Sequence, residues 1–190
     1  MEGLATGRER AARFRALFED DWAFREWYEG AVPRVYGYLF DRCGGLRTVA
    51  EELTQEAFIE AVRHRTRFDG RSDPITWVIS IARHKLADHY RRLAREERRN
   101  LRVVSGPPAE EGRADQWDST ESREVVLHAL RGLPAMQRAA LTLHSMDELS
   151  VGETARELGK SEAAVESLLS RGREGFRRAL DKMREETEDA

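Results

Sequence analysis

Apolar residues recur along most of this chain at spacings of three and four, the period of an amphipathic helix. The first such stripe consists of Phe24, Tyr28, Ala31, Val35 and Leu39. Pro33 lies inside it and predicts a kink or a break, and the pair Gly44-Gly45 predicts its end. The pattern therefore predicts a helix early in the chain.

Two more helices are predicted in the front half. Thr48 with Glu51 has the spacing of a capping box and predicts a helix start; its apolar positions are Val49, Leu53, Ala57, Phe58 and Ala61. Asp73 can cap the next helix and Pro74 suits its first position. That helix runs to about Asn100, with a buried face formed by Trp77, Val78, Ile81, Ala82, Leu86 and Tyr90.

The periodicity stops between Ser105 and Ser119, where glycines, prolines and acids predict a flexible linker and a domain boundary. Beyond it, one short helix ends near Gly132 and another starts at Pro134, with Met136, Ala140 and Leu143 facing inward. We therefore expect an all-α fold of two small helical domains joined by an acidic linker. A length of 190 residues agrees with two such domains.

Composition narrows the possible locations. No apolar run approaches the roughly 20 residues of a membrane span, so no membrane insertion is expected. The charged amino terminus does not resemble a secretory signal. Cys43 is the only cysteine, which excludes an internal disulfide and favours the reducing cytoplasm.

Charge is unevenly distributed along the chain. There are 32 basic and 35 acidic residues, so the net charge of -3 argues against a protein that coats nucleic acid. A basic run nevertheless follows the acidic front part: Arg83, Lys85, Arg91, Arg92, Arg95, Arg98, Arg99 and Arg102. Such a run predicts either a solvated helix face or local, oriented contact with phosphates.

No enzyme site is predicted. The five histidines lack zinc-ligand spacing, and there is no phosphate-binding glycine loop or serine elbow. We expect no metal and no cofactor.

The last two predicted helices have the layout of a helix-turn-helix. Ser150 and Glu153 form a second capping box, Gly159 makes a tight turn, and Ser161 caps the final helix. Small residues at the start of that helix would allow close approach to DNA, and arginines at its end could contact phosphates. Any helical hairpin also needs a glycine and a cap, so a purely structural hairpin remains the alternative.

Several short motifs in this back half resemble the fourth domain of sigma-70 family transcription initiation factors, which reads the minus-thirty-five promoter element. They are Leu133-Pro134, Gln137-Arg138, Glu148-Leu149-Ser150, Glu153-Thr154-Ala155, Leu158-Gly159 and Ser161. In the front half, the stretch from Glu51 to Phe58 resembles the polymerase-binding helix of sigma domain two. Trp77 with Ile81-Ala82-Arg83 resembles the helix that reads the minus-ten element.

Two domains in this order resemble the extracytoplasmic-function (ECF) class. The resemblance implies a sigma domain two at residues 20–100, a linker at 101–120 and a sigma domain four at 121–183, between an extension at 1–19 and a tail at 184–190. It also implies a non-enzymatic factor that binds core RNA polymerase at the clamp helices and flap, directs promoter recognition and DNA opening, and is controlled by an anti-sigma factor.

The resemblance assigns roles to individual residues. The polymerase-binding set is Glu52, Leu53, Gln55, Glu56 and Phe58. The minus-ten set is Arg67, Phe68, Asp69, Gly70, Arg71, Trp77, Arg83, His84, Lys85, Arg91 and Arg92. The minus-thirty-five set is Ser161, Ala164, Glu166, Ser167, Ser170, Arg171 and Arg173. Linker acids that could mimic nucleic acid are Glu110, Glu111, Asp115 and Asp118.

Within these sets some assignments stay open. Phe68 is either part of the base pocket or a core aromatic, and Trp77 is favoured as core. His84 stands where the family commonly has asparagine, and Glu166 and Leu168 stand at common basic positions, so the usual promoter consensus is not expected. A stand-alone helix-turn-helix regulator is the alternative function, but it leaves the two front-half motifs without roles.

Overall fold

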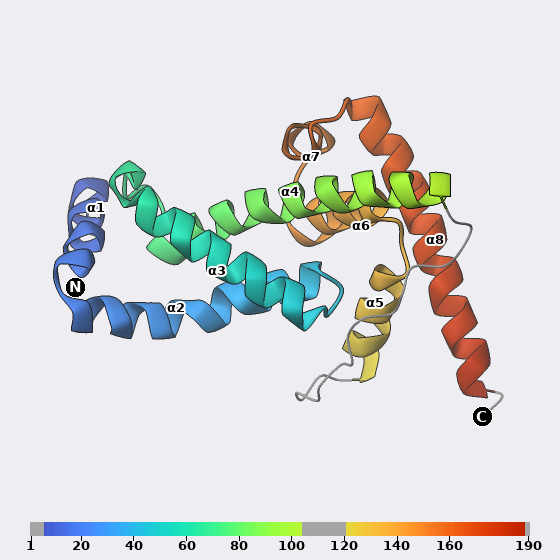
Figure 1. Ribbon diagram of the computed structural model, residues 1–190, viewed down its shortest axis with the longest axis horizontal. Coiled ribbons are helices and arrows are strands. Elements are labelled where there is room, and N and C mark those ends of the chain that lie inside the picture. The colour runs from blue at the N-terminus through green and yellow to red at the C-terminus, as the bar shows by residue number, and fades with distance from the viewer. Residues whose placement is uncertain (1–5, 104–120, 189–190) are drawn as a thin grey trace. The chain divides into compact units, whose positions relative to one another are not determined.

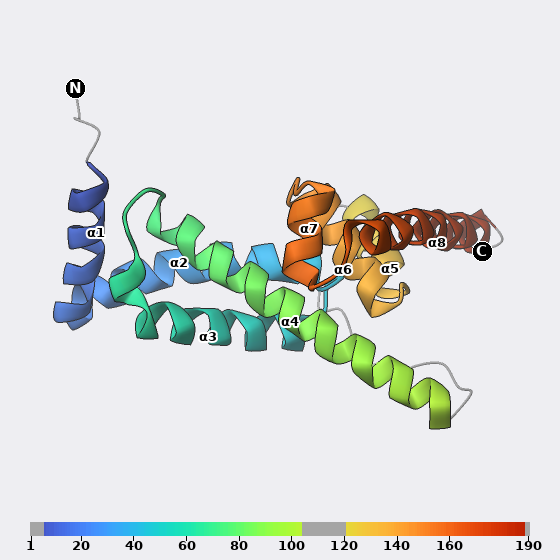
Figure 2. The ribbon, with the colours of Figure 1, turned by 90° about the horizontal axis from the view of Figure 1, so that it is seen from above.

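Figures 1 and 2 show the computed structural model, which describes residues 6–103 and 121–188. All regular elements within these ranges are helical. The chain forms two compact units: Met1–Leu39 with Val49–Lys85, and Phe40–Thr48 with Leu86–Ala190. Because the boundary falls after Lys85, the long helix α4 contributes its first part to one unit and its second part to the other.

The helices of the first unit follow one another with short connections. They are α1 (Gly7–Ala16), η1 (Leu17–Glu19), most of α2 (Asp21–Arg42), α3 (Arg47–Arg63), η2 (Arg65–Arg67) and the start of α4 (Pro74–Val103). In Figures 1 and 2, α1 lies beside the loop that joins α3 to α4.

The core of this unit is built from the predicted apolar stripes. Ala31 and Val35 of α2, Leu53 of α3, and Val78 and Ala82 of α4 are at most 1% exposed. Each helix buries one face and leaves the other to solvent, as the period of three and four predicts. This confirms the predicted buried faces in the front half.

Two predicted helix boundaries differ in the structure. Pro33 lies inside α2, which continues to Arg42, so the helix does not break there. Pro33 is exposed, so the carbonyl that loses its helical partner can bond to water instead. Helix α3 begins at Arg47, which places Thr48 within the first turn rather than at the cap.

The start of α4 agrees with the prediction. Asp73 Oδ1 accepts a hydrogen bond from the backbone N–H of Ile75 at 2.9 Å, and Pro74 is the first helical residue. The helix ends at Val103, a little beyond the expected Asn100. The predicted linker at residues 101–120 lies outside the described residues from 104 onward.

The second unit contains the back-half helices. They are α5 (Glu121–Arg131), α6 (Ala135–Leu141), the π-helical turn η3 (Thr142–Met146), α7 (Val151–Leu158) and α8 (Glu162–Glu188). Both α6 and α7 pack against α8. Met136, Ala140 and Leu143 are buried, as predicted, together with Leu158 and Val165.

A buried arginine closes the turn between α5 and α6. Arg138 is 6% exposed, and its Nη2 donates to the carbonyl oxygens of Arg131 at 2.8 Å and Leu133 at 3.1 Å. These carbonyls lie at and just beyond the end of α5, where a helix leaves acceptors without helical partners. The guanidinium also lies 5.8 Å from the ring centroid of Tyr90.

The only cysteine, Cys43, provides a probe of this unit. It is 2% exposed, and burial raises the pKa of its thiol from 9.0 to about 12, although Arg138 acts in the opposite direction. The stability contributed by the neutral thiol is therefore present below pH 9 and is lost as the pH rises toward 12.

We expect Cys43 in the folded protein to react with iodoacetamide at pH 8 at least about a hundredfold more slowly than in urea, because both thiolate formation and access are suppressed. Mass spectrometry of timed samples measures this ratio. Equal rates with and without urea would contradict the burial of this side chain.

Candidate functional site

The outward face of α3 carries three of its five predicted contact residues. Glu52 and Gln55 are exposed and Glu56 is half-buried. Leu53 and Phe58, assigned to the same set, are 1% and 4% exposed and belong to the core. They hold the helix in place, and within this set only their neighbours Glu52, Gln55 and Glu56 are accessible to a partner.

Sequence reasoning missed one residue on this face. Ile59 is 52% exposed, although a large aliphatic side chain is usually buried. It follows Glu52 by seven residues and Gln55 by four, so all three share one side of the helix. This spacing in the sequence could have identified Ile59 as part of the same face. An apolar residue among carboxylates and an amide is the composition of a protein-binding surface with an apolar centre and a polar rim.

The loop from Arg67 to Ser72 alternates between buried and exposed positions. Phe68 is 1% exposed and Gly70 is buried, while Arg67, Asp69 and Arg71 are exposed. Asp69 Oδ1 accepts from the backbone N–H of Arg71 at 3.0 Å, and its carboxylate pairs with Arg71 Nε at 3.2 Å. Phe68 is therefore a core aromatic, and the polar residues form the outer edge of the loop.

Trp77 is also part of this core. It is half-buried, and its ring centroid lies 5.5 Å from that of Phe68 and 5.7 Å from that of Phe14. Both distances are typical of packed aromatic pairs. The structure thus agrees with the interpretation of Trp77 as a core residue.

The first part of α4 contributes three basic or titratable residues of the minus-ten set. His84 is exposed and Arg83 is half-buried. Lys85 Nζ lies 3.5 Å from Glu60 Oε2 on α3, and Glu60 Oε1 lies 2.9 Å from His64 Nε2. The Lys85 charge is thus partly balanced inside the protein, which leaves His84 as the most accessible of the three.

In the second unit, both terminal nitrogen atoms of the Arg91 guanidinium have partners. Its Nη1 donates to the carbonyl oxygen of Glu157 at 2.7 Å, and its Nη2 pairs with Asp88. Arg92 is exposed. Of these two predicted phosphate contacts, the structure places Arg92 at the surface and ties Arg91 to α7.

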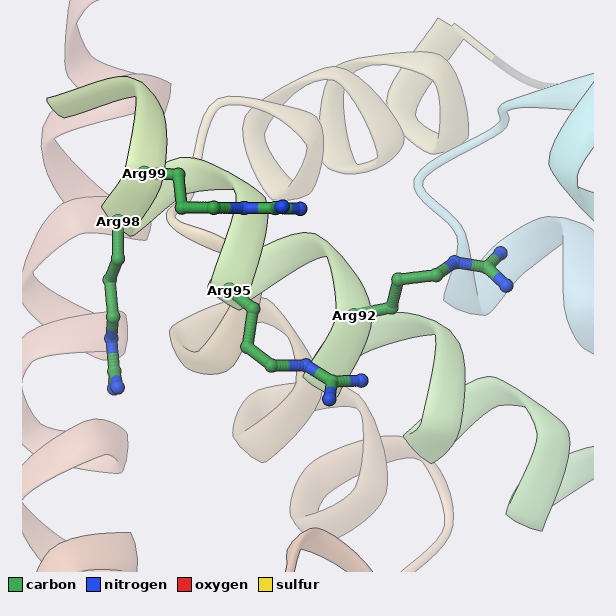
Figure 3. A pocket seen from close by; sticks show the side chains of 4 residues that line it. All are labelled: Arg92, Arg95, Arg98 and Arg99. Atoms are coloured by element: carbon green, nitrogen blue, oxygen red, sulfur yellow. The ribbon is translucent and has the colours of Figure 1, made fainter. Parts of the chain in front are cut away.

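Four arginines of α4 line a cavity of about 500 Å³. Figure 3 shows their side chains leaving the helix, with Arg98 pointing in a different direction from Arg92, Arg95 and Arg99. All four are exposed. Charges of one sign at this density attract polyanions, so this part of the basic run has the charge that a phosphate-binding surface would need.

The helix-turn-helix has the predicted local geometry. Ser150 and Glu153 form a capping box at the start of α7, and Gly159 ends that helix in the left-handed region at φ 59° and ψ 44°. Ser161 Oγ accepts from the N–H of Ala164 at 3.3 Å and so caps α8. The predicted turn and both caps are confirmed.

The predicted minus-thirty-five residues lie along one helix with their side chains accessible. Ala164 is half-buried, and the others are exposed: Ser161, Glu166, Ser167, Ser170, Arg171 and Arg173. Buried residues on the same helix, Val165 and Leu169, pack inward. The burial pattern therefore presents the polar face of α8 to solvent, as entry into a groove requires.

Across residues 6–103 and 121–188, no cluster of histidine, cysteine or carboxylate residues could hold a metal ion. The same ranges contain no helix that is long and apolar enough to span a membrane.

Comparison with known proteins finds two family matches. The family model described as Sigma-70 region 2 matches residues 27–96, and that described as Sigma-70, region 4 matches residues 123–174. These ranges include α3, the loop that follows it, most of α4 and the helix-turn-helix.

Curated relatives agree with these matches. The chain is 36% identical over 153 residues to the ECF RNA polymerase sigma factor BldN of Streptomyces coelicolor, with 77% of this chain and 56% of the relative covered. It is 30% identical to the RNA polymerase sigma factor YlaC of Bacillus subtilis (86% and 92% covered). Identity to the ECF RNA polymerase sigma factor SigX of the same organism is 31% (87% and 88% covered).

A solved structure shares the fold. It is the sigma factor RpoE from Bartonella quintana in complex with the anti-sigma factor NepR, with a TM-score of 0.51 and 22% identity. The similarity covers 83% of this chain and 96% of that one.

The turn of the helix-turn-helix can be tested by substitution. We expect Gly159→Ala to lower the free energy of unfolding by about 1 kcal/mol, because a Cβ is disfavoured at positive φ. No atom comes closer than 4.0 Å to an added Cβ, so the loss reflects conformation rather than a clash. Gly159→Asn is the control, since asparagine tolerates this region and should lose less. Urea unfolding measures both, and equal losses would contradict this explanation.

Proposed function

Because the chain belongs to the ECF class of the sigma-70 family, we propose that it carries out promoter selection through three surfaces: the outer face of α3, the loop after it, and the exposed face of α8. The chain is a promoter-specificity sigma factor and not an enzyme. The observation that supports the proposal is that most of the predicted polar residues on these surfaces are exposed, while the apolar residues beside them are buried: Leu53, Phe58, Phe68, Val165 and Leu169.

The proposed domains are sigma domain two at residues 20–100 and sigma domain four at 121–183, with the linker at 101–120. The two matched family regions fall within these ranges. Since both regions are present, a stand-alone helix-turn-helix regulator is not favoured.

The α3 face is the proposed docking surface for the clamp helices of core polymerase. Ile59 would supply the apolar anchor, and Glu52, Gln55 and Glu56 the polar rim. Carboxylates at a rim favour fast association with a basic partner more than they favour affinity.

The loop from Arg67 to Ser72 is the proposed site that captures a flipped base of the minus-ten element. Extruding a base costs a few kcal/mol, which a preformed pocket offsets. Since Phe68 is buried, the residues available to the strand are Arg67, Asp69 and Arg71. On α4, His84 and Arg92 extend the proposed surface, and the four cavity arginines could follow the phosphates beyond it.

The exposed face of α8 is the proposed reader of the minus-thirty-five element. Arg171 and Arg173 would contact phosphates, and the small residues near the start of the helix would allow close approach. Glu166 can accept a hydrogen bond from cytosine N4 but is repelled by phosphate. This favours an upstream element with a cytosine opposite Glu166.

With a net charge of -3, the whole chain should bind promoter DNA weakly on its own, because non-specific affinity grows with the number of phosphates that are neutralised. Holding both readers on one polymerase raises their effective concentration along the same DNA. The proposed compartment is the cytoplasm, where polymerase works. Control by an anti-sigma factor stays a prediction from the resemblance.

We expect Ile59→Asp to weaken assembly with core polymerase by at least about tenfold, since burying a carboxylate in an apolar contact costs more than 1.4 kcal/mol. Fluorescence anisotropy of the labelled full chain, titrated with core enzyme, measures the affinity. Charge reversal at Glu52 and Glu56 should mainly lower the association rate and make it less sensitive to salt.

Trp22→Asp is the matched control, because Trp22 is also an exposed apolar residue, at 70%, but lies at the start of α2. Normal assembly of the Ile59→Asp variant, at unchanged stability, would contradict the proposed docking surface.

For the upstream reader, we expect Glu166→Gln to change the preferred base at one position of the selected minus-thirty-five element. Arg173→Ala should instead weaken all promoters about equally. In vitro transcription by the holoenzyme on a library randomised over both elements separates these outcomes. An unchanged base preference for Glu166→Gln would show that this carboxylate reads no base.

A further inference from the structure

Helix α1 packs directly against the loop proposed to capture the flipped base, although the region matched by the family model begins only at residue 27. We propose that α1 is a positioning element that holds this loop in its base-capturing shape, and that Arg10 is the positioning residue. The inference rests on the proposed function of the loop.

A side-chain contact ties the two segments together. Arg10 Nε donates a hydrogen bond to the carbonyl oxygen of Gly70 at 2.7 Å, across 60 residues of sequence. Arg10 is half-buried, so water screens this bond less than one at the surface. Hydrogen bonds with a charged donor are shorter and stronger than neutral ones.

The backbones of the two segments also meet at Gly70. A Cβ on Gly70 would lie 1.8 Å from the carbonyl oxygen of Gly7 and 2.9 Å from the backbone nitrogen of Ala11. Gly70 also has a φ of +74°, which disfavours any side chain. The glycine thus serves both the turn of the loop and the close approach of α1.

An aromatic cluster also connects α1 to the start of the loop and to the helix that follows the loop. Phe14 and Phe68 are each 1% exposed, and their ring centroids are 4.9 Å apart at 66°. Phe14 also packs edge-on against Trp77, in the first turn of α4, at 5.7 Å. Aromatic pairs of this geometry stabilise the folded state beyond what the area they bury contributes.

These contacts fall on alternate residues of the loop. Phe68 and Gly70 face α1, while Arg67, Asp69 and Arg71 face solvent. Fixing the first pair therefore fixes the direction of the other three. A loop that is already ordered loses less conformational freedom when it captures a base, and this raises the yield of the captured state.

The capping box at the start of α1 shows that the helix is specified locally. Thr6 Oγ1 accepts from the N–H of Glu9 at 3.3 Å, and Glu9 Oε2 accepts from the N–H of Thr6 at 2.8 Å. This fixes the first turn, which carries Gly7 and Arg10 to the loop. The helix is therefore suited to act as a rigid support.

The experiment uses the full chain in holoenzyme, with a promoter that the wild-type holoenzyme selects from a library randomised over both elements. Each base of its minus-ten element is replaced in turn by an abasic residue, and opening is followed with 2-aminopurine placed next to that element. The variants are Arg10→Ala, Arg10→Lys and, as control, Arg13→Ala, an exposed arginine of the same helix.

We expect Arg10→Ala to lower the opening rate about tenfold while assembly with core polymerase is unchanged, as losing a charged hydrogen bond implies. At the captured position, the abasic substitution should lower the opening rate of the Arg10→Ala holoenzyme by a smaller factor than that of the wild type, because the capture site of the variant is already impaired. Arg10→Lys should recover part of the rate, and Arg13→Ala should behave as wild type.

The salt dependence of promoter binding separates support of the loop from direct contact with DNA. Arg10→Ala should leave the slope unchanged, whereas losing a phosphate contact would reduce it by about one. A reduced slope, or an opening rate equal to that of the wild type, would overturn the positioning role.

Two loop variants distinguish the ways in which this inference can fail. Arg67→Ala and Arg71→Ala should each lower the opening rate. If they do and Arg10→Ala does not, the role of α1 is wrong and the loop assignment stands. If neither loop variant affects opening, the base-capture assignment fails and the inference about α1 fails with it.

Discussion

The burial of Phe68 and Gly70 is the constraint on which the front half of the protein depends. The loop has six residues, and three of them are charged and exposed. Contacts within such a loop are too few to fix its conformation. Because Phe68 packs into the aromatic cluster with Phe14 and Gly70 lies against the backbone of α1, the loop is fixed at two points. The charged side chains then extend from a defined backbone, which is the arrangement that a site of recognition needs.

The same division between support and contact recurs on α3 and α8. On α3, Leu53 and Phe58 fix the helix and Ile59 is left outside. On α8, Val165 and Leu169 point inward, while serines and arginines remain accessible. In each case the residues that a motif identifies are of two kinds, and burial separates those that hold the element from those that can touch a partner. A motif alone does not make this distinction, because both kinds occur at fixed spacings.

Local signals in the sequence were sufficient to predict most helix ends and the buried apolar faces of the helices. Asp73, Ser150 and Gly159 have the predicted roles because a cap or a left-handed turn depends on a few neighbouring residues. The predicted break at Pro33 and the predicted cap at Thr48 were wrong, because these outcomes depend on the exposure of the proline and on where the preceding turn ends. Helix α1 was missed although Thr6 and Glu9 have capping-box spacing. Phe14 on its apolar face packs against Trp27 and also against Phe68, which is more than 50 residues away, and no local pattern indicates the contact with Phe68.

The ion pairs within the protein explain why the basic run of α4 offers less free positive charge to phosphates than its sequence suggests. Lys85 lies beside Glu60, and Arg91 pairs with Asp88 while its other amino group bonds to a backbone carbonyl. Internal pairs of this kind reduce the charge that can neutralise phosphates, and with it the number of counterions that binding releases. The arginines that remain exposed, from Arg92 to Arg99, are concentrated in about two turns of helix. Along α4, the charge that could attract DNA is therefore confined to a short surface, and in the proposed function a contact this small has to be combined with others on the same DNA before it selects a site.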